Sequence, residues 1–365
     1  MMTVGARSVA VLCLSGAMAS AQTAEAPPDS ADVRRRWLAL PGFGWTPETG
    51  FEVGFTVMSV SQSLRDSLAR PTTFTAYVVR STKAQTRAAI DVDRWLPGNT
   101  RRVQATVSAV EYPFAFYGIG DSTTSADEER YVPRWLEGYA QVDQRVRRGT
   151  YLVTALRAGY QEVEARSAGL IQGRAVPGSH ITRTVIATVG VTYDTRDNVV
   201  STRRGRVWSL VYGRSAPAVG ATYDYGRLDA QWRAFRQAKA GHVVAAHAML
   251  SGVDGTVPFD QMPVIGGSRI MRGYGAGRFR DRWVSAVQGE YRSPLWLERL
   301  GAVAFAGVGV AAGSLGRLAE GRPFPSIGIG GRLQVDPVQR SALRVDYAIG
   351  AYGFGGLYVG FNQAF

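Results

Sequence analysis

Short segments in which apolar and polar side chains alternate recur through almost the whole of this 365-residue chain. Successive side chains of a β-strand point to opposite faces, so alternation predicts a sheet with one apolar and one polar face. The segments are about ten residues long and are separated by clusters of Gly, Pro, Asp, Asn and Arg, which is the sequence signature of a transmembrane β-barrel. No stretch supplies the 18 or more consecutive apolar residues that a membrane-spanning helix needs.

The clearest segment is 341–350, where apolar side chains take the odd positions and charged or small ones take the even positions. The odd positions hold Leu343, Val345, Tyr347 and Ile349. Segments 326–336 and 184–194 have the same pattern. A soluble β-sandwich also alternates, but its core rarely holds rows of charges such as Arg227, Asp229 and Arg233. These rows favour a barrel whose interior is filled with water or with a loop.

Sixteen alternating segments can be counted, and closed antiparallel barrels of bacteria contain an even number of strands. They are 51–60, 73–82, 86–96, 100–115, 131–146, 150–167, 181–196, 204–217, 221–238, 242–252, 261–267, 283–296, 300–312, 325–336, 341–351 and 356–365. The predicted fold is therefore all-β, a transmembrane antiparallel β-barrel of 16 strands with a long loop between strands 11 and 12.

The N-terminus predicts export. Arg7 precedes a short apolar stretch, and the small residues Ala19-Ser20-Ala21 follow it, as in a secretory signal peptide of residues 1–21. The alternative, a buried N-terminal helix, would lack a polar face and a cap. Residues 22–50 are interpreted as a linker or periplasmic stub, and residues 51–365 as the barrel. Cleavage would remove Cys13, the only cysteine, and export without disulfides suits the bacterial outer membrane.

The charge balance does not indicate a nucleic-acid partner. The chain has 42 basic and 29 acidic residues, but only Lys83 and Lys239 are lysines and the arginines are scattered along the whole length. Binding of nucleic acid would need basic residues gathered on one face of a protein that stays inside the cell. The arginine excess has two interpretations, contact with lipopolysaccharide phosphates at the outer rim or the composition bias of the genome. Outer-membrane lipid and lipopolysaccharide are the expected surroundings.

No catalytic constellation is visible, so we predict that the protein is not an enzyme and has no cofactor or metal. The chain contains no Gly-x-Ser-x-Gly nucleophile turn. Its three histidines, His180, His242 and His247, lack metal-ligand spacing, and a mature chain without cysteine has no thiolate chemistry.

One connection, 268–282, is rich in glycine and arginine and is not apolar enough for a strand. Gly266-Gly267 followed by Arg272-Gly273-Tyr274 resembles the loop motif of the BamA/TamA-type bacterial surface antigen superfamily of outer-membrane β-barrels. Further matching pieces occur in the same order and cover residues 46–365. They are 46–50, 116–121, 194–198, 204–205, 290–294, 330–333, 343–347 and the terminal Phe365. The resemblance implies that the sixth extracellular loop folds back into the barrel and that its Arg-Gly-aromatic tip docks on the inner wall.

The resemblance also implies partners for Arg272. Glu290 matches the carboxylate that the family uses against the loop arginine. The second family partner is the Asp of a Phe-x-Asp-x-Gly pattern, where this chain has Gly307. Three arrangements are therefore open: Glu290 suffices, Asp346 substitutes, or the loop is held less firmly. A solvated loop arginine is the alternative to all three, because a buried guanidinium must find acceptors.

The last segment resembles the C-terminal strand signal by which outer-membrane barrels are recognised for insertion. Its residues are Val359, Gly360, Phe361 and Phe365, and the resemblance implies contact with the barrel assembly machinery during insertion of the protein itself. Family members that handle polypeptides carry periplasmic POTRA repeats, and none fits before Gly50.

Two functional interpretations follow. In the first, the barrel opens at the seam between its first and last strands and assists insertion or translocation of outer-membrane proteins or lipids, with a separate periplasmic partner protein. In the second, it is a loop-plugged narrow pore or a structural surface protein without insertase activity.

Overall fold

The computed structural model describes residues 33–46, 50–63, 69–83, 85–238, 241–336, 340–351 and 353–365, so the signal peptide predicted for residues 1–21 lies outside the described part. Within these ranges the chain is almost entirely β: one antiparallel sheet of 17 strands and a separate sheet of two. The helical segments are three-residue 3-10 turns, namely η2 (Pro97–Asn99), η3 (Ser125–Asp127), η4 (Pro217–Val219), η5 (Phe259–Gln261) and η6 (Leu315–Arg317). None of the described helices is long and apolar enough to cross a membrane.

The first part of the large sheet consists of β1 (Val33–Thr46), β2 (Gly50–Ser63), β3 (Thr72–Ser81), β4 (Thr86–Trp95), β5 (Arg101–Glu111), β6 (Phe114–Phe116), β7 (Glu129–Arg147), β8 (Thr150–Ala165) and β9 (Thr182–Asp194). The second part consists of β10 (Gly205–Ser215), β11 (Tyr225–Gln237), β12 (Val243–Gly255), β15 (Trp283–Arg292), β16 (Leu300–Ala312), β17 (Phe324–Asp336), β18 (Ser341–Gly350) and β19 (Gly355–Phe361). The small sheet pairs β13 (Val264–Ile265) with β14 (Phe279–Arg280).

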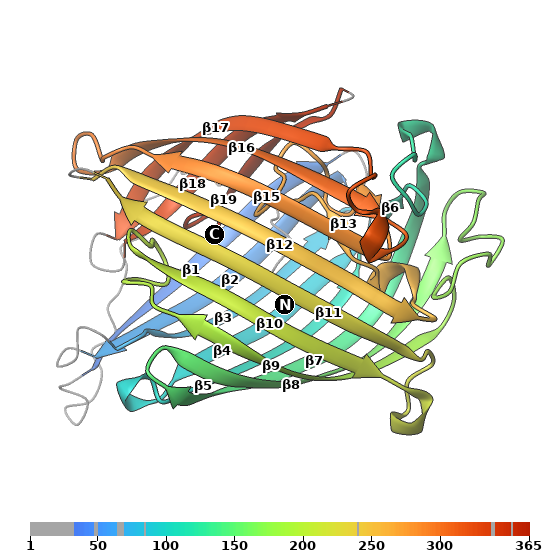
Figure 1. Ribbon diagram of the computed structural model, residues 1–365, viewed down its shortest axis with the longest axis horizontal. Coiled ribbons are helices and arrows are strands. Elements are labelled where there is room, and N and C mark those ends of the chain that lie inside the picture. The colour runs from blue at the N-terminus through green and yellow to red at the C-terminus, as the bar shows by residue number, and fades with distance from the viewer. Residues whose placement is uncertain are drawn as a thin grey trace.

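Neighbouring strands in the chain are neighbours in the sheet, and they lie tilted and side by side in Figure 1. The pairing departs from the order of the chain at two places. Strands β5 and β6 both pair with β7, and β12 pairs directly with β15 because β13 and β14 leave the wall. At one end the connections are short, as at 148–149 and 293–299. At the other end they are long, as at 166–181 and 256–282.

The structure corrects the predicted boundaries at three places. Residues 33–46, interpreted as part of a linker or stub, form β1 and pair with β2 along its whole length. The predicted strand 261–267 contributes only the two residues of β13, which lie outside the wall. The predicted strand 100–115 is divided into β5 and β6. With β1 and this division each adding a strand and 261–267 leaving the wall, the sheet has 17 strands where 16 were predicted.

The faces of the strands follow the predicted alternation. In β18 the side chains of Val345, Tyr347 and Ile349 are exposed on the outside, whereas Arg344 and Asp346 are buried inside. In β17, Ile327 and Ile329 are exposed and Arg332 is buried. This arrangement places an apolar surface outside and charged groups inside, as a wall between lipid and water requires.

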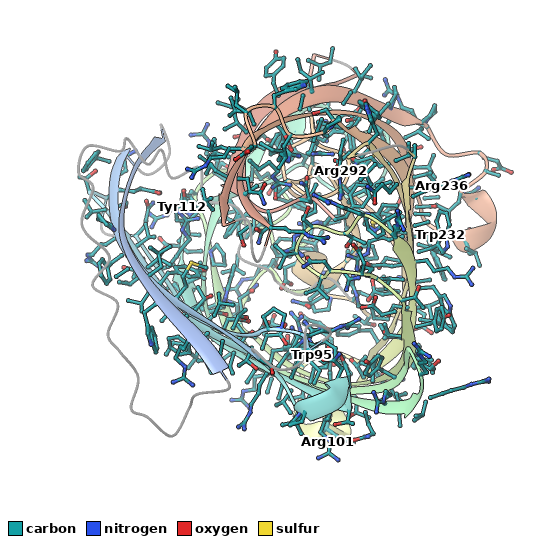
Figure 2. All side chains as sticks on the ribbon, turned by 90° about the vertical axis from the view of Figure 1, so that its left-hand side faces the viewer. Trp95, Arg101, Tyr112, Trp232, Arg236 and Arg292 are labelled. Carbon is teal, nitrogen blue, oxygen red and sulfur yellow. The ribbon has the colours of Figure 1, made fainter. Side chains whose placement is uncertain are left out.

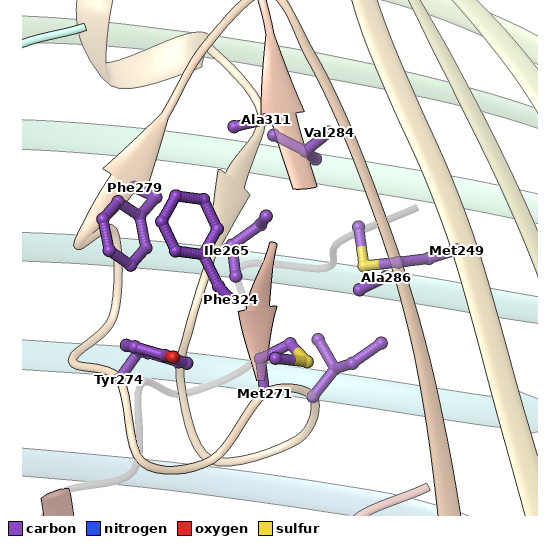
Figure 3. Close-up of a cluster of buried hydrophobic side chains, with 10 residues drawn as sticks. Met249, Ile265, Met271, Tyr274, Phe279, Val284, Ala286, Ala311 and Phe324 are labelled. Atoms are coloured by element: carbon purple, nitrogen blue, oxygen red, sulfur yellow. The ribbon is translucent and has the colours of Figure 1, made fainter. Parts of the chain in front are cut away.

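The inside of the curved sheet is occupied by the connection 256–282. In the view of Figure 2, the strands curve round a central space into which side chains project, and the blue N-terminal strands stand apart from the red C-terminal ones. A buried apolar cluster joins the connection to the wall (Figure 3). Its members include Ile265, Met271, Tyr274 and Phe279 from the connection and Phe324 from β17, and the Phe279 and Phe324 rings stack with centroids 3.6 Å apart.

The C-terminal residues differ from the predicted strand signal. Strand β19 ends at Phe361, whose side chain lies outside the described part, and Asn362 has a φ of 64°, which turns the chain. As a result Phe365 does not continue the outer face of β19. Its ring lies 5.1 Å from that of His247 and 6.2 Å from that of Phe235, on the inner side of the sheet.

Candidate functional site

The loop motif is assembled by the hairpin of β13 and β14. Just after β13, the N–H of Gly267 donates a hydrogen bond of 3.0 Å to the carbonyl of Tyr274, which closes the segment 267–274 on itself. Both Gly266 and Gly267 have positive φ. Met271 precedes the Arg-Gly-Tyr tip and donates its N–H to the Gln288 side chain on β15, 3.1 Å away. The loop is therefore closed on itself, and the residue before its tip is bonded to the wall at β15.

Arg272 is completely buried and bonds two carboxylates at once. Its Nη2 donates to Glu290 of β15 and its Nη1 donates to Asp346 of β18, both at 2.5 Å. The guanidinium also lies over the ring of Phe305, 3.4 Å from the centroid. The Ser326 hydroxyl donates to the backbone carbonyl of Arg272. Of the arrangements that the sequence left open, the geometry has Glu290 and Asp346 together, and Arg272 is not a solvated residue.

Three more arginines surround these two carboxylates. Arg292 donates to Glu290 at 2.8 Å, Arg332 donates to Asp346 at 2.5 Å, and Arg344 lies 3.7 Å from Asp346. We call these six residues the arginine network: Arg272, Glu290, Arg292, Arg332, Arg344 and Asp346. Four guanidinium groups face two carboxylates, so the network carries two excess positive charges. Each carboxylate is consequently shared by several arginines.

Two glycines of the wall provide the room for this arrangement. A Cβ on Gly330 would lie 1.9 Å from Oδ1 of Asp346, so only glycine leaves space for that carboxylate. At Gly307, where the resemblance implies an Asp, a Cβ would lie 3.2 Å from the sulfur of Met271. The loop packs its methionine onto the glycine, and the carboxylate comes from β18 instead.

The tip also bonds the last strand. The hydroxyl of Tyr358, on β19, accepts a 2.8 Å hydrogen bond from the N–H of Gly273 and donates at 3.1 Å to the carbonyl of Tyr274. Tyr274 in turn donates to the carbonyl of Pro325 at 2.6 Å and accepts from the N–H of Ala351 at 2.8 Å. Tyr358 was not singled out by the sequence, because nothing local marks an inward tyrosine as a loop contact.

A second group of contacts joins segments at the end of the sheet that has the short connections. Arg292 donates to the carbonyl of Thr202, in the β9–β10 connection, and to the carbonyl of Phe365, at 3.1 and 2.8 Å. In the same connection Asp197 pairs with Arg340 of the β17–β18 turn at 3.0 Å. Arg292 thus joins the arginine network to the β9–β10 connection and to the C-terminal residues, a role that its position in the sequence does not reveal.

One carboxylate at this end has a shifted pKa. Burial would raise the pKa of Asp197, but the backbone N–H groups of Arg204 and Arg203 and the Arg340 guanidinium hold it below its ordinary value. The carboxylate is ionised at neutral pH and ties the connection in place. In the described part of the chain, no group of three or more His, Cys, Asp or Glu residues is placed to hold a metal ion.

The sheet has two edges. In the described residues, β1 has a residue-by-residue register with β2 and with no other strand, and β19 has one with β18 alone. The β1–β2 pairing extends over 14 residues from each strand, whereas β19 pairs over seven. The seam between first and last strands therefore lies between β1 and β19. The sequence placed it between 51–60 and 356–365, but β1 covers that edge of β2.

Comparison with protein families explains this combination of a curved sheet and an inward loop. Residues 68–355 match the model of the Omp85 superfamily domain. The chain belongs to the Omp85 superfamily. It is accordingly a protein of the bacterial outer membrane, from a family of the BamA/TamA type, as the loop motif predicted.

Two solved structures of Omp85-like shape resemble the chain. BamA from Haemophilus ducreyi lacking POTRA domains 1–3 superposes with a TM-score of 0.59 at 12% identity, covering 90% of this chain and 70% of that one. CdiB from Acinetobacter baumannii gives a TM-score of 0.56 at 11% identity, covering 91% of this chain and 60% of that one. At these identities the likeness is one of fold. No curated protein sequence matches the chain.

Within the Omp85 fold, sidedness follows from the connections. Outer-membrane barrels have short periplasmic turns and long extracellular loops, so the connection 256–282 enters from the extracellular side and the β9–β10 connection covers the periplasmic side. The arginine network lies between them, and it contacts both.

Proposed function

We propose that this Omp85 protein assists the insertion or translocation of outer-membrane proteins or lipids by separating β19 from β1 at the seam. The observation that carries the proposal is the seam itself. An unpaired strand edge presents a row of N–H and C=O groups that can pair with an incoming strand. A membrane protein that kept such edges permanently would leave polar groups unsatisfied in lipid, so open edges indicate a wall built to exchange partners.

The composition of the edge strands supports the proposal. Pro41 lies in β1 and cannot donate a ladder hydrogen bond, which confines proline to edge strands. Strand β19 contains Gly355, Gly356 and Gly360 among its seven residues, and glycine weakens a strand because it has no side chain to pack. Strand β19 is the weaker side of the seam, because it pairs over only seven residues and contains three glycines, whereas β1 pairs with β2 over 14 residues.

The filled interior supports a lateral route over a route through the lumen. The loop tip is buried against the wall at Arg272, Met271 and Tyr274. On the periplasmic side, the β9–β10 connection is held by Arg292 and Arg340. Movement through the centre would have to break both contacts, whereas separation at the seam leaves them in place.

The contacts of Tyr358 give the opening a control point. Because its hydroxyl bonds the backbone at Gly273 and Tyr274, the loop holds β19 from the inside. Besides its seven pairs with β18, β19 packs Tyr358 against a buried apolar cluster that includes Val303, Phe305 and Ala348, so release of these hydrogen bonds loosens β19 without detaching it. We propose that a separate periplasmic partner protein delivers the substrate.

A disulfide lock across the seam tests the proposal. Single cysteines at Ala39 or Gly42 of β1 would be combined with single cysteines along 356–360 of β19 in the full chain, which has no cysteine besides Cys13. Crosslinking requires Cα atoms about 4.4–6.8 Å apart, so the efficient pairs report the seam register. The matched control is a disulfide between Ala39 and Val57, which are partners in the β1–β2 register, so it joins two strands on the same side of the seam.

The readout is complementation of a deletion strain, measured as outer-membrane protein levels and envelope integrity. We expect the seam lock to behave like the deletion, with activity restored by reductant, and the control disulfide to complement fully. Complete complementation by an efficiently locked seam would show that lateral opening is not the mechanism.

A second function is favoured by one observation, the charged lumen wall. Arg102 pairs with Asp93 at 2.5 Å and Arg157 pairs with Glu137 at 3.1 Å on the inner face of β4, β5, β7 and β8. Such a wall suits a narrow, loop-plugged pore or a structural surface protein. Planar-bilayer recordings of the protein with and without residues 268–282 distinguish a plugged pore from a structural protein, because a pore must show channel events once the plug is removed.

A further inference from the structure

The outer face of the sheet has a groove beside the seam. It has a volume of about 440 Å³ and crosses four neighbouring pairs of strands, from β15 to β19. Ala302, Ala304 and Gly331 form its floor, and Tyr291, Tyr347 and Leu357 form its walls. Small residues on two strands between larger ones produce the depression.

The groove is continuous with the surface that faces lipid. Val287 of β15 and Ile327 of β17, on two of the strands that line the groove, are exposed apolar side chains of the outer face. Apart from the hydroxyls of Tyr291 and Tyr347, the side chains in its lining carry no polar atoms, so the surface of the groove is mainly apolar. An apolar depression within the hydrocarbon layer is filled by what the layer contains, the acyl chains of lipids.

The turn below the groove supplies a second observation. Leu297 and Glu298 both have positive φ, 48° and 60°, an uncommon conformation for residues other than glycine. The turn holds Leu297 86% exposed and Trp296 56% exposed, on the side of the short connections. Tryptophan and leucine at this level are favourable only when lipid covers them, because Trp is enriched at the membrane interface.

Arg299 completes the site. It is exposed and lies in the same turn, three residues before Ala302, which places it about 10 Å from the groove floor along the strand. A guanidinium is suited to phosphate because it donates two parallel hydrogen bonds. The spacing fits a molecule with a phosphate at the interface and an acyl chain in the membrane.

We propose that this groove binds one acyl chain of an inner-leaflet glycerophospholipid, with the lipid phosphate at Arg299. Leu357 belongs to β19, so the bound chain contacts the outer side of the last strand. The site stands independently of the insertase proposal, since it depends only on the groove and the turn.

Native mass spectrometry of the delipidated full chain, titrated with phosphatidylethanolamine, tests the proposal. Ala304→Phe fills the groove and Arg299→Gln removes the phosphate contact, while Ala187→Phe makes the same change on the exposed outer face of β9 and serves as the control. We expect Arg299→Gln and Ala304→Phe each to weaken retention of one lipid by about tenfold, and Ala187→Phe to leave it unchanged. Equal retention by all three variants would overturn the site.

Two further measurements keep the test decisive. Retention of lipid A in place of phosphatidylethanolamine would refute the assignment to the inner leaflet. A lipid-free dimer that covers this face would refute the proposal that a lipid occupies the groove. If Ala304→Phe fails to fold, a phospholipid with a photoreactive acyl chain replaces it on the wild-type protein. Crosslinks concentrated on 302–304 and 329–331 support the site, and crosslinks spread evenly over the outer surface refute it.

Discussion

The arginine network makes an unusual prediction: removing a carboxylate should cost more stability than removing the loop arginine. Asp346→Asn takes the counter-charge from Arg272, Arg332 and Arg344 together and raises the excess positive charge from two to three. Breaking a buried ion pair by removing one partner costs about 3–5 kcal/mol, because the remaining charge is left uncompensated.

Arg272→Met has the opposite effect on the charge. It lowers the excess to one, and both carboxylates keep a partner, since Glu290 still bonds Arg292 and Asp346 still bonds Arg332. Two charge-assisted hydrogen bonds and the contact with the Phe305 ring are lost, but methionine does not incur the several kcal/mol that desolvating a guanidinium costs. We therefore expect a net loss of about 2 kcal/mol. From most to least stable, the expected order is wild type, Arg272→Met, Asp346→Asn.

The assay is the unfolding midpoint of each full-length variant in detergent, followed by heat-modifiable electrophoretic mobility. Asp93→Asn is the control, because Asp93 also pairs with an arginine on the lumen wall but its side chain is 20% exposed, and a pair in contact with water contributes about 0–1 kcal/mol. If Arg272→Met destabilises the protein as much as Asp346→Asn, the shared-charge reasoning is wrong.

Three other predictions follow from the same contacts. Tyr358→Phe leaves the N–H of Gly273 without its acceptor, at a cost of about 1–3 kcal/mol, and should speed tryptic cleavage after Arg272 at least tenfold. An unchanged cleavage rate would show that the Tyr358 hydroxyl does not hold the loop to β19. Gly330→Ala should destabilise the protein by about 1–3 kcal/mol because its Cβ collides with Asp346, whereas Gly331→Ala, with nothing within 4 Å, should change stability by less than about 0.5 kcal/mol in the same unfolding assay. The lowered pKa of Asp197 means that its stabilising contribution is fully present above the ordinary carboxyl pKa of about 4 and is lost as the pH falls through its lower folded-state pKa. Hydrogen exchange of 195–204, corrected for intrinsic rates, should rise on acidification in the wild type and should rise less in Asp197→Asn, in which Asp194 still bonds Arg196.

The faces of the strands could be predicted because alternation is a local property. Whether Val345 and Tyr347 point outward depends only on the two-residue period of a strand and on which side is apolar. The loop motif was equally visible, since Arg272-Gly273-Tyr274 is contiguous. A buried guanidinium needs acceptors, so Glu290 and Asp346 could be named as candidates before the contacts were known.

Strand β1 was missed because its sequence contains three consecutive arginines, Pro41 and two glycines, which resemble a linker. Its pairing with β2 supplies the backbone hydrogen bonds that its own composition does not favour, and a tertiary context of this kind overrides propensity. For the same reason the N-terminal side of the seam is β1 and not β2, where the sequence had placed it.

The sequence by itself determined which side chains face lipid and which face the lumen, and it marked the loop that folds inward. The tertiary structure alone decided how those inward groups meet: that Arg272 shares its carboxylates with three other arginines, that Tyr358 holds the loop to the last strand, and that Phe365 turns inside. The physical reason is distance along the chain. A strand's period is set by neighbouring residues, whereas a contact such as Arg272 with Asp346 joins residues 74 positions apart and exists only after the sheet has curved round them.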